Sequence, residues 1–285
     1  MYNKEILSQQ AGNALIKEAI IKDGSLMIAR CGNSELNCCE FYFKNNTGKK
    51  KHAFPPNITK LATNNAGVFP VDNTILNNFS KIYLESLALT DIMAVWQLPF
   101  EDYVCNNICE NADLIPLRSL EPYYDLEPWS INLKDQTVLV INSFAKTIET
   151  QYETVREKLF DNPAVLPPFK LKTYRSVQSI AGTKTIFTNW IDAYHYMCND
   201  IEKMRFDVAL IGAGGYGLPL AAFIKKMGKK AIYIGGAIQI LFGIKGSRWK
   251  SHDIISQFFN PYWTEPSKKT ETPSNYKMIE GGCYW

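Results

Sequence analysis

The sequence predicts an α/β fold, namely a single Rossmann-like domain with a mostly parallel sheet and helices on both faces. Apolar stretches alternate with stretches whose apolar residues recur at helical spacing, which is the pattern of strands alternating with helices. Several stretches are apolar throughout, as is typical of strands buried on both faces of a parallel sheet. No internal repeat or long linker divides the chain, so we expect one domain over residues 1–285. The predicted buried strands are "SLMIAR" at 25–30, "TVLVIN" at 137–142, "VALIG" at 208–212 and "AIYIG" at 231–235.

The other elements follow from periodicity and turn residues. Residues 44–60 are polar, basic and interrupted by Pro55 and Pro56, which predicts a surface loop. Residues 114–129 are aromatic and are predicted to be irregular. The tail over 260–285, rich in Pro, Lys and Thr, is expected to wrap the domain or remain mobile. Helices are predicted at 12–21, 75–87, 101–111, 147–160, 189–204 and 217–228, and further strands at 91–96 and within 170–180.

Composition limits the classes of function. Lys and Arg number 31 against 28 Asp and Glu, and a net charge of +3, evenly spread, does not indicate a nucleic-acid binder. The seven cysteines and the lack of an amino-terminal signal sequence predict reduced thiols in a cytoplasmic protein. No apolar run reaches the roughly 18 residues needed to span a bilayer, so peripheral contact with a membrane surface is the most that we expect.

A glycine-rich turn, "GAGGYG" at 212–217, follows one of the predicted strands. It matches GxGxxG in the strand-to-helix context that lets a helix amino terminus face an anion. A dinucleotide site also requires an acidic residue at the end of the next strand, where a glycine pair stands instead, so a nicotinamide or flavin site is disfavoured. Two interpretations stay open for these turns: close packing of helix and strand, or close approach of a ligand to the backbone. The glycines concerned are Gly212, Gly214, Gly215, Gly217, Gly235 and Gly236.

Common catalytic motifs are missing from the sequence. The three histidines, His52, His195 and His252, have no partner at metal or triad spacing. There is no GxSxG elbow, no GxxxxGK[ST] loop and no HExxH motif. A His-centred hydrolase is therefore not supported.

The remaining candidate site is "RCGNSE", which ends the first predicted strand, because ligands of open α/β sheets bind beyond the carboxyl ends of the strands. In an extended chain Asn33 and Glu35 alternate with Ser34, so their side chains are predicted to point to the same side. Two such oxygens suit Mg²⁺ or Mn²⁺, which also takes water and substrate phosphates as ligands. A capped turn without a ligand is the alternative interpretation of the spacing.

The segment "SLMIARCGNSE" resembles the opening of the GT-D fold glycosyltransferases, in which a strand ends in a pattern like R-[YF]-G-D-G-E. Arg30, Gly32 and Glu35 match that pattern, whereas Asn33 replaces its first acid and Ser34 its second glycine. The segments "NNAGVFPVD", "NLKDQTVLVINSFAKTIETQYETVREKLF" and "EGGCYW" also look like uncharacterised proteins encoded with bacterial surface-polysaccharide genes. The resemblance covers most of the chain, in short patches.

The resemblance implies a metal-assisted transferase that uses a nucleotide-diphosphate sugar and a glycan acceptor in bacterial surface polysaccharide biosynthesis. It assigns Asn33 and Glu35 to a Mn²⁺ or Mg²⁺ ion, with Glu35 as the catalytic residue, and Arg30, Gly32 and the glycine turns to the donor. Because asparagine brings no charge, we expect a weaker metal affinity than an acid would give. The alternatives are a non-catalytic binding protein of polysaccharide assembly and a nucleotide-dependent oxidoreductase built on "GAGGYG". The acids considered for activation of the acceptor are Asp72, Asp91 and Asp125.

Overall fold

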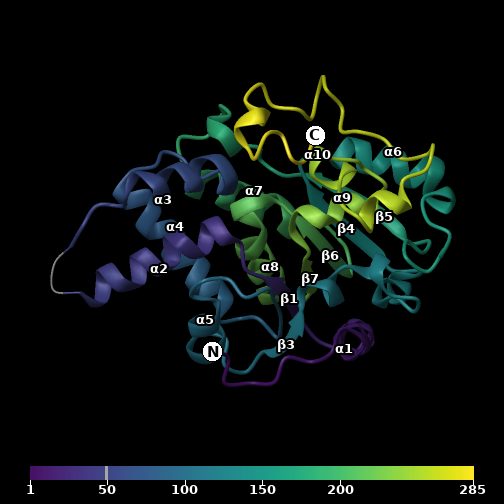
Figure 1. Cartoon of the computed structure of the whole chain (residues 1–285), viewed down its shortest axis with the longest axis horizontal. Coiled ribbons are helices and arrows are strands. Elements are labelled where there is room, and N and C mark those ends of the chain that lie inside the picture. Colours follow the sequence, from purple (N-terminus) through teal and green to yellow (C-terminus); the bar gives the residue numbers. More distant parts are fainter. Residues whose placement is uncertain (49–50) are drawn as a thin grey trace.

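A computed structural model describes residues 1–48 and 51–285 of the chain. Seven strands within these residues form one sheet in the order β3-β2-β1-β7-β6-β4-β5, and every neighbouring pair is parallel. The predicted α/β fold, with helices on both faces of the sheet, is confirmed (Figure 1). The strands are β1 (Leu26–Arg30), β2 (Ile92–Val95), β3 (Asp113–Pro116), β4 (Thr137–Asn142), β5 (Lys170–Arg175), β6 (Val208–Gly212) and β7 (Lys230–Tyr233).

The four strands predicted from continuous apolar runs, β1, β7, β6 and β4, lie next to one another at the centre of the sheet. Successive side chains of a strand point to opposite faces. Accordingly β4 contributes Leu139 and Ile141 to one hydrophobic core and Val138 and Val140 to the other, and all four side chains are fully buried. Each such burial stabilises the fold by roughly 1.5–3 kcal/mol, which explains why the interior positions of these strands are apolar.

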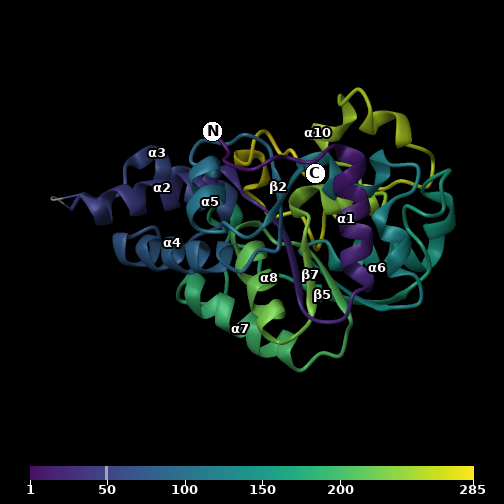
Figure 2. The same cartoon turned by 90° about the horizontal axis from the view of Figure 1, so that it is seen from below.

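Helices cover the two faces of the sheet unequally. Figure 2 shows α4, α7 and α8 together on one side of the sheet and α1 and α6 on the other. In α4 the buried residues Leu76, Phe79 and Tyr83 recur at three to four positions, and the Asp72 carboxylate caps the helix by accepting a backbone N–H at 2.9 Å. In the described residues, no helix combines the length and the apolar character needed to cross a membrane. The longer helices are α1 (Gln9–Ile21), α2 (Asn33–Thr47), α4 (Asn73–Leu87), α5 (Glu101–Asn107), α6 (Ala145–Val155), α7 (Trp190–Glu202) and α8 (Gly217–Lys226).

Several element boundaries differ from the prediction, and three regions differ most. The segment 114–129 is not wholly irregular, because the edge strand β3 extends into it as far as Pro116; so short a strand ending in proline carries little sequence signal. The predicted loop at 44–60 is shorter, since α2 continues to Thr47 and α3 (Pro56–Leu61) starts with proline in its first turn, where proline is tolerated. Residues 49–50 of that loop lie outside the described part of the chain. The helix predicted at 101–111 already ends at Asn107.

The predicted extended geometry of Asn33 and Glu35 is wrong, because α2 begins at Asn33, directly after its cap Gly32. Leu36 and Cys39 bury one face of this helix in the core, and the positive end of the helix favours an acid such as Glu35 in the first turn. In a helix, residues two positions apart lie about 200° apart around the axis. The two side chains therefore point in different directions.

The cysteines and the tail are both integrated into the packing. All seven cysteines are free and buried, which agrees with the prediction of reduced thiols, and burial raises the pKa of the Cys38 thiol to about 12. In the tail, Trp263 and Cys283 are buried. The buried Glu271 accepts the backbone N–H groups of Lys146 and Thr147, each at 3.0 Å, and thereby joins the tail to the first turn of α6.

Candidate functional site

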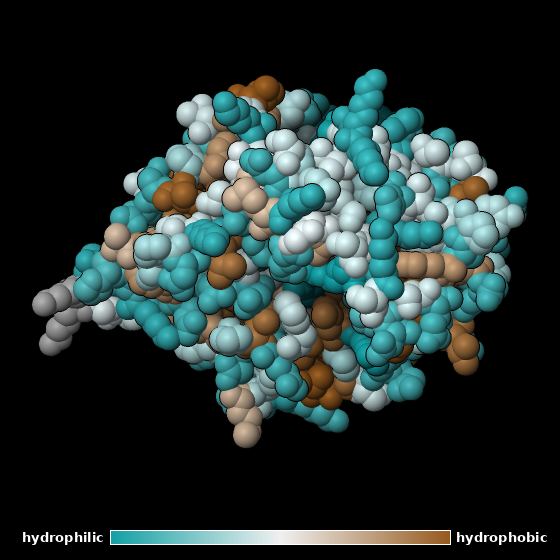
Figure 3. All heavy atoms as spheres, turned by 45° about the horizontal axis from the view of Figure 1, so that its top comes forward, coloured by the Kyte–Doolittle hydropathy of each residue, from teal (hydrophilic) through white to brown (hydrophobic). Residues whose placement is uncertain are grey.

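A pocket of about 650 Å³ lies at the carboxyl ends of β1, β4, β6 and β7. The connection after β4 leads to α6 on one face of the sheet, whereas the connection after β6 leads to α8 on the other face. Neighbouring strands whose connections diverge in this way leave a crevice, which is where open α/β sheets bind ligands. Figure 3 brings this end of the molecule forward and shows a mainly hydrophilic surface with small hydrophobic patches.

Arg30, the last residue of β1, is held at the pocket with its charge unpaired. Its Nε and Nη2 donate to the carbonyl oxygen of Cys31 at 3.0 and 2.7 Å, and its guanidinium carbon lies 4.7 Å from the centre of the Trp96 ring. The Trp96 indole N–H donates to the same carbonyl oxygen at 3.0 Å. No carboxylate in the described part of the chain lies within ion-pair distance of Arg30. The guanidinium is thus oriented in advance to bind an anion.

Glu35 in the first turn of α2 has a buried carboxylate that makes no hydrogen bond to another described residue. It is only 6% exposed, and it folds back so closely that a Cβ at Gly32 would lie 2.1 Å from its Oε2. The Tyr83 hydroxyl accepts the Gly32 N–H at 3.1 Å and fixes the turn. Burial raises the pKa of Glu35, an effect that its own backbone N–H and Arg30 oppose. A charged carboxylate left in this state favours a positively charged ligand.

Glu35 fits the role of a cation ligand, and Asn33 fits it less well. Asn33 lines the pocket but is exposed, and its Oδ1 accepts from the Asn37 side chain at a long 3.4 Å. Among residues 1–48 and 51–285, no three His, Cys, Asp or Glu side chains converge on one point as a metal cage would require. One carboxylate and one amide oxygen, completed by water and phosphate, are nevertheless ligands that Mg²⁺ uses. Binding of one cation by both side chains stays a prediction.

The two glycine turns lie side by side and are packed mainly against the protein itself. A Cβ at Gly212 would lie 2.6 Å from the carbonyl oxygen of Gly235, and a Cβ at Gly217 would lie 2.2 Å from the Tyr233 ring. Gly235 also has a left-handed φ of 75°, a conformation that favours glycine. Close packing therefore accounts for these positions without a ligand. Of the predicted site residues, Arg30, Gly32, Asn33, Glu35, Gly212, Gly214, Gly235 and Gly236 line the pocket, whereas Gly215 and Gly217 do not.

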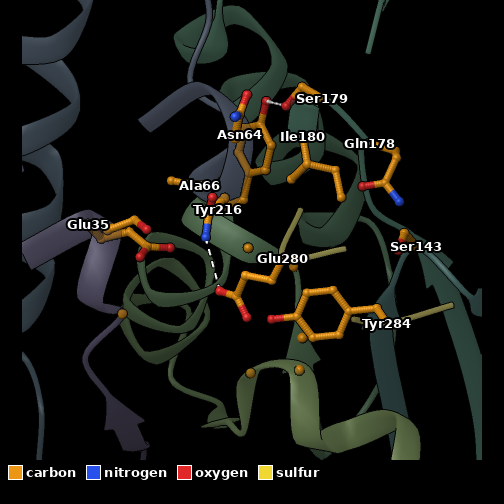
Figure 4. A pocket seen from close by; sticks show the side chains of 18 of the residues that line it. Glu35, Asn64, Ala66, Ser143, Gln178, Ser179, Ile180, Tyr216, Glu280 and Tyr284 are labelled. Carbon is orange, nitrogen blue, oxygen red and sulfur yellow. Dashed lines mark hydrogen bonds between the residues drawn. The ribbon is translucent and has the colours of Figure 1, made fainter. Parts of the chain in front are cut away.

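Carboxy-terminal residues that sequence reasoning missed close one side of the pocket. Glu280, which Figure 4 shows beside Tyr284, forms an ion pair with Arg248 and accepts a hydrogen bond from Asn65 Nδ2 at 3.2 Å. The Arg248 guanidinium carbon lies 5.0 Å from the centre of the Tyr284 ring, and Tyr284 and Trp285 both line the pocket. The only sequence signal for this closure is "EGGCYW", in which an acid precedes two glycines and a turn is therefore expected.

Glu35 and Glu280 are the carboxylates among the lining residues. The aspartates considered as bases lie elsewhere: Asp72 caps α4, Asp91 precedes β2 at the opposite end of the sheet, and Asp125 does not line the pocket. None of the three histidines, all of which the structure describes, lines it either. Any carboxylate chemistry in this pocket is therefore assigned to two residues.

A part of the wall away from Arg30 is built from neutral polar residues. They come from the π-helical turn Ala62–Ala66 and from the loop after β5. The Ser179 hydroxyl donates to the carbonyl oxygen of Gly67 at 2.6 Å and lies 3.0 Å from the Tyr216 hydroxyl, so these bonds tie the turn, the loop and the residue before α8 together (Figure 4). The Ser179 hydroxyl thus joins three segments of this part of the wall.

No family model matches the chain, and no curated protein matches it. Among solved structures, the chain is similar to a selenomethionine-substituted structure of domain of unknown function 1792, with a TM-score of 0.46 and 14% identity over 82% of this chain and 78% of that one. A second structure of that domain, which is described as having a distinct glycosyltransferase fold, gives a TM-score of 0.44 and 14% identity over 81% of this chain and 78% of that one. Similarity at this level does not establish an activity for the chain.

Proposed function

We propose that the chain is a glycosyltransferase that uses a nucleotide-diphosphate sugar with the help of a divalent cation. The observation that supports this most is that one pocket combines an unpaired guanidinium, Arg30, with a buried carboxylate, Glu35, that has no hydrogen-bond partner among the other described residues. A diphosphate and its cation supply what both groups lack, since phosphate binds the guanidinium and the metal binds the carboxylate. The resemblance of "SLMIARCGNSE" to R-[YF]-G-D-G-E supports the same class of substrate.

In this proposal the donor lies along the ends of β1 and β7. Arg30 binds the diphosphate, and Glu35 would hold Mn²⁺ or Mg²⁺. When bound, the cation stabilises negative charge on the departing diphosphate. Arg30 adds to this stabilisation because the Cys31 carbonyl and the Trp96 ring fix its guanidinium before the reaction begins.

We assign activation of the acceptor hydroxyl to Glu280. It is the lining carboxylate that donor binding does not use. Arg248 holds it in an ion pair, and Asn65 orients the carboxylate through a hydrogen bond. Glu280 takes the proton of the acceptor hydroxyl while the hydroxyl oxygen bonds to the anomeric carbon, and the diphosphate leaves with the electrons of the broken bond.

The setting of the reaction rests on the resemblance alone. The segments "NNAGVFPVD" and "EGGCYW" are similar to proteins encoded with bacterial surface-polysaccharide genes. We therefore propose a glycan acceptor, a role in surface polysaccharide biosynthesis, and a cytoplasmic protein with peripheral contact to the membrane.

One observation favours a second candidate, a non-catalytic protein that binds the donor. Asn33 stands where the family pattern has an acid, and it is both neutral and exposed. An oxidoreductase has no such support, because Gly235 and Gly236, at the position of the ribose-binding acid, lie against the side chains of Arg30 and Tyr284.

Calorimetry with UDP-, GDP- and dTDP-sugars, with and without MnCl₂, followed by an assay of donor hydrolysis, tests the proposal. Metal-dependent binding with hydrolysis supports the transferase. Metal-dependent binding of a donor, with no hydrolysis of any donor tested, supports the binding protein instead. If no nucleotide sugar binds, both the transferase and the binding protein are contradicted. Saturable binding of NAD at micromolar concentration would support the oxidoreductase.

A further inference from the structure

The neutral polar part of the pocket contains side chains whose hydrogen-bonding capacity is unused. We call Asn64, Ser143, Ser176 and Gln178 the amide wall; all four line the pocket. None of their side chains makes a hydrogen bond to another residue in the described part of the chain, although the neighbouring Asn65 and Ser179 do. Asn64 and Ser176 are buried and line the pocket, so their free donors and acceptors are available to a ligand that occupies it.

Asn64 is the clearest member of the amide wall. It is 8% exposed, and it lies in the π-helical turn Ala62–Ala66, a conformation that is frequent at functional sites. The turn ends at Gly67, whose φ of 74° is left-handed and whose carbonyl oxygen accepts the Ser179 hydroxyl. Figure 4 shows Asn64 beside Ser179 and Tyr216. Ser179 thus holds the end of this turn, and the Asn64 amide is free to donate and to accept.

Ser143 and Ser176 follow β4 and β5, which are adjacent strands. Ser176 is only 3% exposed, and its backbone N–H donates to the carbonyl oxygen of Asn142 at 3.3 Å. Its hydroxyl makes no hydrogen bond to another described residue. Asn142 itself is satisfied, because its Nδ2 donates to the Gly212 carbonyl oxygen at 2.6 Å and its Oδ1 accepts the Phe144 N–H at 2.8 Å. The fold thus satisfies the asparagine that ends β4 and leaves the serines beside it unpaired.

The chemistry of the amide wall selects the kind of ligand. Amides and hydroxyls each donate and accept, and together they match a ring that carries several hydroxyl groups. No member of the wall is charged, so an anionic substituent placed there would be desolvated without a cation to pair with it. Of the other lining cations, Arg248 is already paired with Glu280, and Lys60 is exposed on α3. An uncharged sugar ring satisfies the wall, whereas a carboxylated sugar does not.

We propose that the amide wall binds the sugar ring of the donor and selects an uncharged hexose over a carboxylated one. This inference rests on the proposed function, because it takes the diphosphate to lie at Arg30 on the other side of the pocket. The sugar then extends from the end of β1 across β6 toward β4 and β5, with Asn64 and Ser176 bonded to its hydroxyl groups.

Calorimetry in the presence of MnCl₂ tests the inference with UDP, UDP-glucose and UDP-glucuronic acid, and with GDP, GDP-mannose, dTDP and dTDP-glucose. In wild type, at least one uncharged sugar nucleotide should bind about tenfold more tightly than its own diphosphate, as one or two net hydrogen bonds provide. Asn64→Ala and Ser176→Ala should lose most of that gain and bind the diphosphate as wild type does. Asn78→Ala changes an exposed asparagine of α4 outside the pocket and should leave every affinity unchanged.

Two outcomes overturn the inference while the proposed function stands. One is a diphosphate that binds with metal but gains nothing from its uncharged sugar, or keeps the whole gain in both Asn64→Ala and Ser176→Ala. The other is UDP-glucuronic acid that binds as tightly as UDP-glucose or more tightly. If no diphosphate binds at all, the proposed function fails, and the inference fails with it. Circular dichroism of the two variants confirms folding, and Ser176→Ala decides the matter if Asn64→Ala unfolds.

Discussion

The two carboxylates of the pocket are held in opposite ways by two regions of the chain. Glu35 lies in the first turn of the rigid helix α2, is 6% exposed, and has no hydrogen-bond partner among the other described residues. Glu280 lies in the tail at a left-handed φ of 46°, and its side chain is 54% exposed and paired with Arg248 and Asn65. The buried acid is unsatisfied, and the exposed one is satisfied.

This difference indicates two different tasks. A buried carboxylate without a partner is costly, and it becomes favourable when a cation completes it. A carboxylate that a cation and a hydrogen-bond donor already hold is oriented before the acceptor arrives, which suits a base. Substitution of either acid should therefore reduce function. Loss of Glu35 should affect donor binding, and loss of Glu280 should affect turnover.

Glu280→Gln should give the largest change in turnover. Without a base, we expect donor hydrolysis to fall on the order of 10²- to 10⁴-fold, while donor affinity stays within about twofold of wild type. Steady-state hydrolysis and calorimetry on the same samples measure both. The matched control is Glu265→Gln, an acid of the same tail that pairs with Lys250 outside the pocket, and it should behave as wild type. Equal losses of affinity and turnover in Glu280→Gln would assign Glu280 to the donor.

Arg30→Lys should weaken donor binding by about tenfold, because lysine keeps the charge but loses the planar fork that the Cys31 carbonyl and Trp96 orient. Calorimetry with the best nucleotide sugar measures the loss. Arg205→Lys, on the surface outside the pocket, serves as the control for the substitution itself. Unchanged affinity in Arg30→Lys would mean that the guanidinium does not contact the donor.

Asn33→Asp should raise Mn²⁺ affinity several-fold, since a charged oxygen replaces a neutral one beside Glu35. Titration of Mn²⁺ followed by thermal shift measures the change. Asn37→Asp adds the same charge one turn further along α2 and should give a smaller gain. Equal gains in the two variants would show a general effect of added charge, and the idea that Asn33 and Glu35 share one ion would have to be abandoned.

The smallest effect concerns stability and pH. Burial raises the pKa of Glu35, so the folded state binds its proton more tightly than the unfolded state, in which a glutamate titrates near pH 4.3. The contribution of the protonated form to the free energy of unfolding is therefore lost as pH rises above that value. Urea denaturation from pH 5 to pH 8 should show Glu35→Gln gaining stability relative to wild type. A difference that does not depend on pH would mean that the carboxylate is not desolvated.

Sequence patterns predicted the central sheet because burial on both faces leaves a continuous apolar signal. The runs "TVLVIN" and "VALIG" coincide with β4 and β6, residue for residue. The turn after β1 was placed correctly but given the wrong local geometry. Asn33 to Glu35 carry no apolar periodicity of their own, and only the burial of Leu36 and Cys39 further along shows that the helix has already begun.

The tail and the amide wall lay beyond sequence reasoning for a different reason. Glu280 and Asn64 are far from Arg30 in the chain, and nothing in a single sequence says that they meet at one pocket. What distinguishes them is which side chains have hydrogen-bond partners, and only a structure shows this. Asn65 is paired and Asn64 is not among the described residues, although the two asparagines are neighbours in "TNNAG". Contacts of this kind depend on tertiary packing.

Calorimetric titration of Glu35→Ala with the nucleotide sugar that wild type binds best, in the presence of MnCl₂, tests the central claim most directly. Circular dichroism confirms that the variant is folded, and Glu40→Ala, which removes an acid paired with Lys44 on the same helix outside the pocket, is the control. We predict that Glu35→Ala loses metal-dependent donor binding while Glu40→Ala binds as wild type does. A folded Glu35→Ala variant that binds the donor with wild-type affinity would contradict the account.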